Sequence, residues 1–595
     1  MLSGLKIFRG ALKQFVPFGL MRIWMERHYG ECVDMPLFYY PGFAKRVKRI
    51  VKFLLPYGFV RRFARPFVSK PVIPADVNSL KKVWKEGQVT ILCTRHVLYV
   101  ARLFEHVLRH FGKNVIITTE EPRQYGNGAH VVICPQMFHA LPDKFAAFQM
   151  EQTISSRWLT PEYLGMLNAA MPIFDYSQKN ICFWRERNIP LLKLYYLPID
   201  FLPDMRAQKV QQPYDVVFYG DPTSPRRQKW LDELKRRFDV HVISEVFGDE
   251  LHRELAKAKV VVNVHYYDNA MLETTRLYEV LSLGCSVVVS ERSCDSEEER
   301  RLEHCVDFVP VGDIEAMSSR IAHWLSDDSR RVDRVEATYR ELSTRCSAFD
   351  YFFARFLLAF DIIGFDDFYR FAGNFVNFTG NRVCLSLPES LDRRQKFDSV
   401  NKYDFEVFPG LRHLRGWTGC GLSYKFIFRK AVELGLNRIM VCEDDVVFPE
   451  DFGMRLRKCE EYLATKGEWH VFQGMMADVG DVTVRNVEFV SGETFLLLDH
   501  MISTVFNIYS SSVYGYFLQW DEKNGDPEVN TIDRSLEGYD LNVVTTRPFL
   551  VGHDEGLVSD LWGLGNAKLY AKLIRASTKK LDKLIAEFLS RKSDG

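Results

Sequence analysis

The sequence predicts an α/β protein in which two Rossmann-like domains precede a third α/β domain. Short apolar stretches alternate with amphipathic stretches over residues 76–350, a pattern typical of parallel sheets flanked by helices. A further strand, loop and helix pattern begins with RVCLSLPESLDRRQKF at residue 382. A chain of 595 residues is also too long for one hydrophobic core, so several domains are expected.

The first 75 residues are expected to form a basic amphipathic segment. In KRVKRIVKFLLPYGFVRRFARPF, lysines and arginines lie between phenylalanines, leucines and valines. Such a segment can lie on an anionic membrane surface, with its aromatic rings among the headgroups and its cations near the phosphates. Two amphipathic helices packed on the next domain explain the same pattern. Both interpretations stay open.

Composition predicts a cytoplasmic protein, with peripheral contact to the inner face of a membrane as an open alternative. The 12 cysteines are scattered without a CxxC pair, which is typical of reduced thiols rather than of disulfides or a zinc site. Basic residues interrupt the apolar start of the chain, so no signal peptide is expected. The most apolar later stretch, residues 351–365, contains Arg355 and Asp361 and is too short to span a bilayer. The net charge of +1 argues against nucleic acid as a partner.

Residues 76–205 form the first predicted Rossmann-like domain and residues 206–362 the second. Candidate strands of the first are TILCT, VIITT and HVVICP, and those of the second include YDVVFY, AKVVVNV and SVVVS. A helical, aromatic-rich connector follows. The third domain, residues 363–595, closes with KLYAKLIRASTKKLDKLIAEFLSRKS, whose apolar spacing predicts an amphipathic helix.

The stretch VVFYGDPTSPRRQKWLDEL predicts an anion site at the start of the second domain. A strand ends before Gly220, and a polar loop leads to a helix that begins near Ser224. Backbone amides at a helix N-terminus attract anions; Gly220 would let a phosphate approach closely, and Arg226 or Arg227 would supply charge. A plain turn explains the same glycine.

The stretch NVHYYDNAMLETTRLYEVLSLGCSVVVSE, residues 263–291, places Glu273 and Glu279 around the start of a helix. Together with QMEQTISSRWLTPEYLGMLNAAMPIFDYSQKNI and LPIDFLP, it resembles bacterial glycosyltransferases of the GT-B fold over about residues 130–300. The resemblance implies that the first domain takes an acceptor and the second a nucleotide sugar. The donor-cleft residues that we predict are Gly220, Arg226, Arg227, His265, Glu273, Arg276 and Glu279.

The roles of the two glutamates stay open. They are closer together than in the related retaining families, and capping and solvating the helix is an alternative role for both. No catalytic base can be assigned in this half.

The third domain carries an acid triplet, because IMVCEDDVVFPEDF runs an apolar strand into Glu443, Asp444 and Asp445. Carboxylates beside a hydrophobic core need solvent or a cation. If the strand continues through Asp444, alternation points Glu443 and Asp445 to one side. A divalent metal bound there would neutralise a diphosphate.

Three blocks in this domain resemble the family 25 glycosyltransferases, the enzymes of lipooligosaccharide and collagen galactosylation, over about residues 380–565. They are RVCLSLPESLDRRQKF, GWTGCGLSYKFIFRKAVELGLNRIMVCEDDVVFPEDF and RPFLVGHDEGLVSDLWG. Tyr424 stands where that family usually has histidine, which puts one family contact in doubt. The resemblance implies a GT-A fold, a Mn²⁺ or Mg²⁺ cofactor, a UDP-sugar donor and inversion of the anomeric centre.

The resemblance also implies roles for single residues. Asp445, Glu443 and His553 are the implied metal ligands, and Asp533 and Glu443 the implied catalytic residues. For His553 and Asp533, a structural histidine and a solvated loop aspartate are the alternatives. The remaining implied donor contacts are Arg393, Arg394, Gly419, Ser423 and Asp444.

The whole sequence therefore predicts a bifunctional glycosyltransferase that acts on a bacterial surface glycan of the lipopolysaccharide, lipooligosaccharide or capsule type. Its partners would be nucleotide sugars and a glycan or lipid-linked glycan acceptor. The alternative is a single active family 25-like domain with a non-catalytic N-terminal docking module. A hydrolase of phosphate esters at the acid triplet is a further, less favoured alternative.

Overall fold

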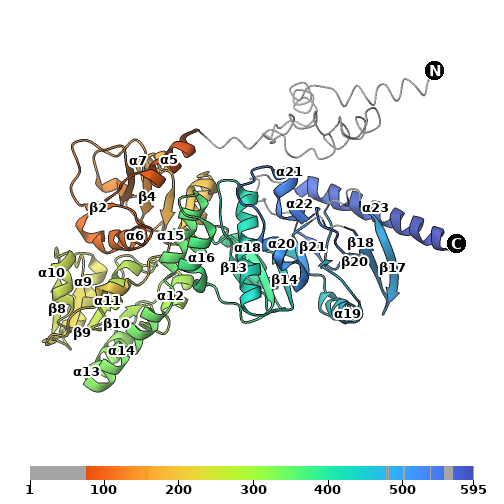
Figure 1. Cartoon of the computed structure of the whole chain (residues 1–595). Coiled ribbons are helices and arrows are strands. Elements are labelled where there is room, and N and C mark those ends of the chain that lie inside the picture. Colours follow the sequence, from red (N-terminus) through yellow and green to blue (C-terminus); the bar gives the residue numbers. More distant parts are fainter. Residues whose placement is uncertain are drawn as a thin grey trace. The chain divides into compact units, whose positions relative to one another are not determined.

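The computed structural model contains three large sheets that follow one another along the chain (Figure 1). The structure describes residues 75–593 except 155, 157, 478, 480–481, 500, 502, 537 and 555–566. The basic N-terminal segment, with its two open interpretations, lies outside the described residues. The predicted α/β class, with two Rossmann-like regions and a third α/β region, is confirmed.

The first sheet has six parallel strands in the order β2-β1-β3-β4-β5-β6. The strands are β1 Val89–Leu92, β2 Val115–Thr118, β3 Ala129–Ile133, β4 Ala146–Gln149, β5 Ile173–Asp175 and β6 Leu194–Tyr196. The helices are α5 Ala75–Glu86, α6 Leu98–His110, α7 Pro161–Ala169 and α8 Gln178–Glu186. The central strands β3 and β4 are buried throughout and mostly apolar because helices cover both faces of such a sheet.

The second sheet has five parallel strands in the order β11-β10-β9-β7-β8. The strands are β7 Tyr214–Tyr219, β8 Val240–Ile243, β9 Ala258–Asn263, β10 Val287–Glu291 and β11 Asp307–Val309. The helices are α9 Pro225–Lys235, α10 Gly248–Leu255, α11 Thr274–Leu283, α12 Ser296–Leu302, α13 Ile314–Leu325 and α14 Asp328–Thr344. Valines of β7, β9 and β10 form its core with Trp230 and Leu234 of α9.

The aromatic-rich connector forms α15 Ala348–Ala359 and α16 Phe365–Ala372. Helix α15 returns to the first sheet region, where Phe353 packs edge-on against Phe104 and Phe356 against Phe174. The apolar stretch noted in the sequence is therefore a buried helix. Among the described helices, none combines the length and the apolar character that crossing a bilayer requires.

The third sheet has eight strands in the order β13-β12-β14-β19-β16-β20-β18-β17. They are β12 Arg382–Ser386, β13 Glu406–Pro409, β14 Arg438–Glu443, β16 Val471–Gln473, β17 Val484–Val490, β18 Glu493–Leu498, β19 Phe506–Ser510 and β20 Val543–Arg547. Strands β13, β12 and β14 are parallel, whereas β19 runs antiparallel to β14. A separate pair joins β15 Val446–Val447 to β21 Gly552–His553.

The helices of this region are α17 Leu391–Val400, α18 Gly416–Glu433, α19 Phe452–Thr465, α20 Tyr514–Leu518, α21 Pro527–Asn530, α22 Ile532–Leu536 and α23 Ala567–Ser593. Helix α23 is the closing helix that the apolar spacing predicted.

A buried ion pair ties the third sheet region to the rest of the chain. The guanidinium of Arg355 on α15 donates to both carboxylate oxygens of Glu389 at 2.7 and 3.0 Å. The backbone N–H of Tyr196 donates to the same carboxylate at 3.0 Å. Burial acts to raise the pKa of Glu389, but Arg355 and Arg412 lower it to about 2. The loop before α17 is thus fixed against both the first sheet and the connector.

Candidate active sites

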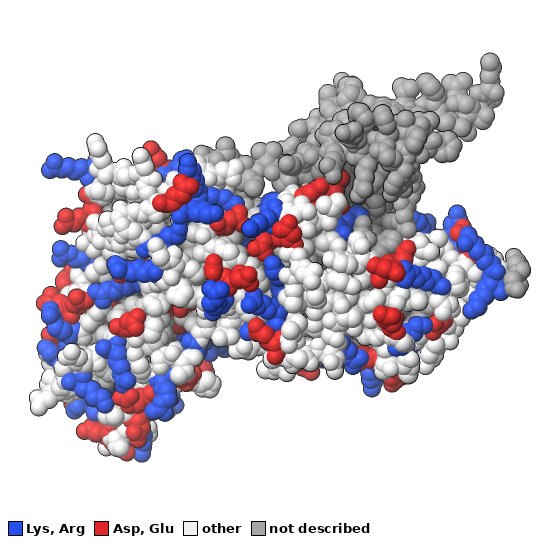
Figure 2. Space-filling view, viewed as in Figure 1, with Lys and Arg blue, Asp and Glu red and all other residues white. Residues whose placement is uncertain are grey.

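Two polar clusters lie at the carboxyl ends of strands, where parallel α/β sheets bind their ligands. One, the arginine cluster, follows β7, β9 and β10 and consists of Arg226, Arg227, Arg276, His265, Glu273 and Glu291. The other, the acidic cluster, follows β14 and consists of Glu443, Asp444 and Asp445. Positive and negative side chains are interspersed over the molecular face shown in Figure 2. On that face, a charged ligand would therefore be recognised by individual clusters of side chains and not by one large patch of a single charge.

Gly220 follows β7 with a backbone φ of +114°, a conformation that favours glycine. A Cβ atom there would lie 2.6 Å from Nη2 of Arg276, whose guanidinium also donates to the carbonyl of Tyr219. The space above Gly220, which the sequence assigned to a phosphate, is therefore filled by Arg276. A role of Gly220 in donor binding stays a prediction. Gly220 would act indirectly, by leaving space for the guanidinium of Arg276.

Glu273 joins two of the predicted arginines. Its carboxylate accepts hydrogen bonds from Arg227 Nη2 at 2.8 Å and from Arg276 Nη1 at 2.9 Å. Burial acts to raise the pKa of Glu273, but the two guanidinium groups hold it well below its usual range. Burial, followed by the charge of Arg276, lowers the pKa of Arg227 to about 10. This half of the cluster is a compact ion network.

Arg226 pairs with Glu291, which follows the predicted strand SVVVS and was not among the predicted site residues. The guanidinium donates to the two carboxylate oxygens at 2.7 and 2.5 Å and also reaches Asp268 at 3.0 Å. Glu291 is fully buried. A glutamate ending the apolar run VVVSE was the available signal, because an acid there needs a partner.

His265 is buried between these two carboxylates. Its Nε2 lies 2.9 Å from the carbonyl of Arg292, and its Nδ1 lies 3.7 Å from Glu273. Burial acts to lower the pKa of His265, but the carboxylates of Glu273 and Glu291 raise it. Glu279 lies further along α11, where it contacts His252 at 2.9 Å and the Tyr219 hydroxyl at 3.2 Å. The structure thus separates Glu279 from the other predicted donor residues.

The first sheet contributes a buried carboxylate that the sequence analysis did not single out. Asp175, at the end of β5, accepts hydrogen bonds from neutral groups, including Trp184 Nε1 and Gln149 Nε2, both at 2.8 Å. Burial raises the pKa of Asp175 to about 7. Its neighbour Ser177 donates to Asp295 of the second region at 2.7 Å, so the polar ends of the two sheets face each other.

The acidic cluster splits in two directions, because β14 ends at Glu443 and a turn follows. Asp444 accepts a hydrogen bond from Ser386 Oγ at 2.6 Å and another from Arg393. The same guanidinium reaches Asp445 at 3.0 Å. Glu443 turns elsewhere and accepts from Thr504 Oγ1 at 2.5 Å. Burial, followed by the charge of Asp445, raises the pKa of Glu443.

His553 lies beside Asp445, with 3.4 Å between Nε2 and Oδ2. The contact exists because β21 pairs with β15 so that His553 is opposite Val446. Burial acts to raise the pKa of Asp445, but His553 and Arg393 hold it below its usual range; the pKa of His553 is raised in turn. The structure therefore brings these two predicted metal ligands together.

The donor set is compatible with a divalent cation. Oδ1 of Asp445 is buried and accepts no hydrogen bond from the described residues, so one hard oxygen is available. Across the described residues, no three His, Cys, Asp or Glu side chains converge as a complete metal cage. Mg²⁺-type sites at nucleotides commonly use one or two carboxylates plus phosphate oxygens and water, and Asp445 with His553 would suffice for that.

Asp533 lies on α22, near the acidic cluster. Its carboxylate accepts from Thr531 Oγ1 at 2.8 Å and from the backbone N–H of Arg534 at 2.9 Å. Burial, then the charges of Glu443 and Asp533, raise the pKa of the Cys420 thiol. Both carboxylates are therefore within electrostatic reach of the same buried group.

Gly419 and Ser423 make structural contacts on α18. A Cβ atom on Gly419 would lie 2.9 Å from the backbone nitrogen of His413, and Ser423 Oγ accepts from the backbone N–H of Leu411 at 2.8 Å. Tyr424 is fully buried and donates to the Thr504 carbonyl at 3.3 Å. Burial raises the pKa of Tyr424 well above its ordinary value, so it does not serve as an acid or base near neutrality. Donor contacts by Gly419 and Ser423 stay a prediction.

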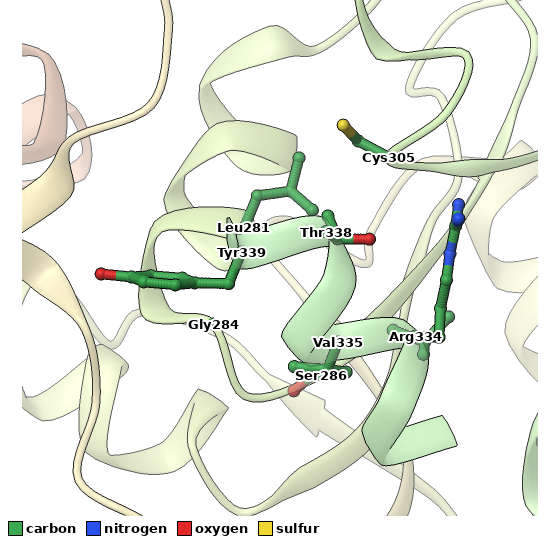
Figure 3. A pocket seen from close by; sticks show the side chains of 9 residues that line it. Leu281, Gly284, Ser286, Cys305, Arg334, Val335, Thr338 and Tyr339 are labelled. Atoms are coloured by element: carbon green, nitrogen blue, oxygen red, sulfur yellow. The ribbon is translucent and has the colours of Figure 1, made fainter. Parts of the chain in front are cut away.

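The adjacent Arg393 and Arg394 point to different places. Arg393 contacts Asp444 and Asp445, whereas Arg394 donates to Asp398 at 2.9 Å and lines a pocket that Arg393 does not line. A second, much smaller hollow lies beside Gly284, Cys305 and Tyr339 (Figure 3). Its volume of about 10 Å³ has room for no more than a water molecule.

Comparison with known proteins places these two sites in segments of one class, the glycosyltransferases. Residues 200–348 match a family profile described as "Glycosyl transferase-like", and this segment contains the arginine cluster. Residues 410–519 match the profile "Glycosyltransferase family 25 (LPS biosynthesis protein)", and this segment contains the acidic cluster. Both resemblances stated from the sequence are thereby confirmed.

Individual relatives match only short segments. The chain is 29% identical over 126 residues to uncharacterized protein L140 of Acanthamoeba polyphaga mimivirus, covering 18% of this chain and 38% of that protein. It is 31% identical over 96 residues to the probable inactive glycosyltransferase 25 family member 3 of Rattus norvegicus, covering 15% and 17%. The chain thus spans well under two thirds of the length of these relatives.

A solved structure of the β-glucosyltransferase of phage T4 aligns with 43% of this chain and 95% of its own. The TM-score is 0.30 and the sequence identity is 13%.

Proposed function

We propose that this protein is a bifunctional glycosyltransferase with one nucleotide-sugar site at the arginine cluster and a second at the acidic cluster. The observation that carries the proposal is the acidic cluster itself. Its three carboxylates are buried or half-buried and lie within a segment that matches the family 25 profile; among the described residues, Arg393 contacts Asp444 and Asp445, and His553 contacts Asp445. Such an excess of negative charge calls for a cation.

Asp445 and His553, with Glu443 beside them, would hold Mn²⁺ or Mg²⁺ at the third sheet. The bound cation supplies positive charge that stabilises a departing nucleoside diphosphate. Arg393 keeps Asp444 and Asp445 in position through its two contacts. Asp533 is the proposed base, because a carboxylate within reach of the acceptor hydroxyl can take its proton as the anomeric centre is inverted.

The arginine cluster would bind the diphosphate of the second donor. Three arginines meet two glutamates and the exposed Asp268, so a diphosphate would take the place of Asp268 at Arg226. Arg276 over Gly220 and the N-terminus of α9 would face the anion.

The proposed acceptor is a bacterial surface glycan, free or lipid-linked, and galactose from UDP-galactose is the proposed sugar of the third-sheet site. The description of the matched family as lipopolysaccharide biosynthesis proteins supports this substrate class. Two transferases on one chain raise the local concentration of the first product at the second site. A cytoplasmic location, with the basic N-terminal segment at the inner membrane face, would bring the sites to a lipid-linked acceptor.

A second candidate is one active family 25-like domain with a docking module before it. The observation in its favour is that each arginine of the arginine cluster already has a carboxylate partner inside the protein. The matched rat protein is described as probably inactive, so similarity to the family does not settle activity at the acidic cluster either.

The test is nucleotide release from UDP-, GDP- and CMP-sugars with Mn²⁺, comparing the intact protein with Asp445→Asn. We expect one donor to be consumed and its turnover to fall by about 100-fold or more in the variant, because several kcal/mol of charge stabilisation are lost. Asp451→Asn, an exposed acid beside the same strand end, is the matched control and should retain full turnover.

A second donor whose turnover survives Asp445→Asn would belong to the arginine cluster and support two active sites. Turnover that is unaffected by Asp445→Asn for every donor would contradict the proposed role of the acidic cluster. A single donor that depends wholly on Asp445 would favour the docking-module alternative.

A further inference from the structure

A pocket of about 320 Å³ lies where the three sheet regions meet. Its walls come from α8 of the first region, α12 of the second, the connector helix α15 and the β12–α17 loop of the third. The volume is within the range of about 300–1,000 Å³ that is typical of small-molecule sites. No residue of the arginine cluster or of the acidic cluster lines it, although Arg394, a predicted donor contact, does.

The pocket shares a wall with the acidic cluster. Ser386 lines the pocket, and its Oγ donates to Asp444 at 2.6 Å. Arg394 lines the pocket from α17, while the preceding residue, Arg393, contacts Asp444 and Asp445. A ligand with its diphosphate at the acidic cluster would therefore have its remaining part directed toward this pocket.

The lining of the pocket suits a planar polar group. Phe352 and Phe375 provide aromatic surface, and their ring centroids are 5.8 Å apart. Gln178 and Asn377 add amides that can donate and accept hydrogen bonds at the edge of a ring. Arg301 is already neutralised by Asp200 at 2.9 Å, so the pocket lacks a strong anion-binding charge from α12.

The walls are held at a fixed separation by the buried ion pair described above. Arg355 lies one turn after Phe352 on α15, and its partner Glu389 directly follows the pocket residues Leu387 and Pro388. Removing either partner would leave a buried charge unpaired, which is strongly unfavourable. The N-terminal half and the β12–α17 loop therefore form one rigid surface.

From these contacts we infer that the junction pocket receives the nucleoside of the donor used at the acidic cluster, so that the N-terminal half completes the C-terminal site. This inference rests on the proposed function of the acidic cluster and deepens it. The aromatic surface would stack on the base, and the amides would contact its edge. The C-terminal region alone would then lack two walls of its own nucleoside site.

The test fills the pocket from the N-terminal side. Gln178→Trp on α8 and Asn377→Trp after the connector each place a bulky ring in the pocket without touching the acidic cluster. Glu186→Trp, an exposed position on the same helix α8, is the matched control. Calorimetry with UDP and Mn²⁺, and with GDP and Mn²⁺, measures binding to the full chain. The part of the binding that Asp445→Asn abolishes reports on the acidic cluster.

We expect both pocket variants to weaken this Asp445-dependent binding about ten-fold or more, and Glu186→Trp to leave it unchanged. Photocrosslinking with 4-thio-UDP gives a second readout that needs no pocket variant. Asp445-dependent labelling should appear in peptides covering residues 348–378 or 175–196. Thermal unfolding of each variant shows whether its fold is intact. If both pocket variants are unfolded, the photocrosslinking result alone tests the inference.

Asp445-dependent binding that is unchanged in both folded pocket variants would overturn this inference and leave the proposed function in place. Labelling confined to residues 410–547, which do not line the pocket, would do the same. If the full chain shows no Asp445-dependent binding of either nucleotide, both the inference and the proposed C-terminal site fail.

Discussion

The arginine cluster and the acidic cluster both lie at the carboxyl ends of strands, yet they balance charge in opposite ways. In the arginine cluster, three arginines and two glutamates form direct pairs at 2.5–2.9 Å. In the acidic cluster, Asp444 and Asp445 share Arg393, and Asp445 also contacts His553. Among the described residues, the first cluster is close to self-sufficient, whereas the second has more carboxylates than cations.

The comparison indicates where each cluster gains its stability. A paired network stabilises the fold without a ligand, and breaking it leaves a buried charge behind. An unbalanced cluster instead relies on neutral donors, such as Ser386 and Thr504, and on whatever cation the substrate brings.

Breaking the paired network should have the largest effect on stability. Arg227→Ala removes a guanidinium whose side chain is only 5% exposed and leaves Glu273 with a single arginine. We expect the free energy of unfolding of the second region to fall by about 3–5 kcal/mol. Hydrogen exchange of peptides covering residues 214–291 measures this loss locally.

Arg236→Ala is the control for that experiment, because Arg236 lies at the end of the same helix with its side chain 73% exposed and pairs only with Glu233. Its change should stay within about 0.5 kcal/mol. Equal losses for the two variants would show that the arginine cluster is not the self-supporting network described above.

A carboxylate with neutral partners provides an intermediate case. Asp175 has a pKa of about 7 in the folded protein and an ordinary value of 3.8, so the folded state holds its proton more tightly. Its stabilising contribution is therefore full below about pH 4 and is lost as the pH rises through 7, with a total of at most about 4 kcal/mol. Asp175→Asn removes this contribution to the dependence of the free energy of unfolding on pH.

Urea unfolding of the wild type and of Asp175→Asn between pH 4 and pH 8 measures the effect. The stability of the variant relative to the wild type should increase across that range. Asp215→Asn is the control, since Asp215 is a half-exposed carboxylate that pairs with Lys259. A relative stability of Asp175→Asn that does not change with pH would contradict the raised pKa.

Much of the acidic cluster could be predicted from sequence, because its motif is local and its chemistry is distinctive. Strand alternation would have paired Glu443 with Asp445 only if the strand continued through Asp444, but β14 ends at Glu443 and a turn follows. It is Asp444 and Asp445 that share Arg393, while Glu443 accepts a hydrogen bond from Thr504. The approach of His553 followed only from the resemblance to a family. The pairing of β21 with β15 brings His553 close to Asp445, and the local sequence pattern does not predict that pairing.

Other features depended on tertiary packing that the sequence pattern does not contain. The direction of Arg393 and Arg394 was one, because neighbours on a helix point about 100° apart and only the packing of α17 decides which faces the acids. The partner of Arg226 was a second such feature, because Arg226 lies on α9 whereas Glu291 lies at the end of β10. The antiparallel half of the third sheet was not predicted either; apart from the tight β17–β18 hairpin, its strands pair with partners that are distant in sequence, such as β14 with β19 and β18 with β20.

The smallest expected effect concerns the neutral donors of the acidic cluster. Thr504→Val keeps the shape of the side chain but removes the hydroxyl that donates to Glu443 at 2.5 Å. Hydrogen bonds to charged groups contribute more than neutral ones, so we expect a loss of about 1–2 kcal/mol in the free energy of unfolding, measured with urea in the presence of EDTA.

Thr494→Val, a half-buried threonine of β18, is the matched control and should change stability by less than about 0.5 kcal/mol. If Thr504→Val proves as costly as Arg227→Ala, then a neutral hydroxyl supports the acidic cluster as strongly as arginine supports the other, and the contrast between the two sites fails. A small loss would agree with the proposal that a bound cation and diphosphate supply further stabilisation to the acidic cluster.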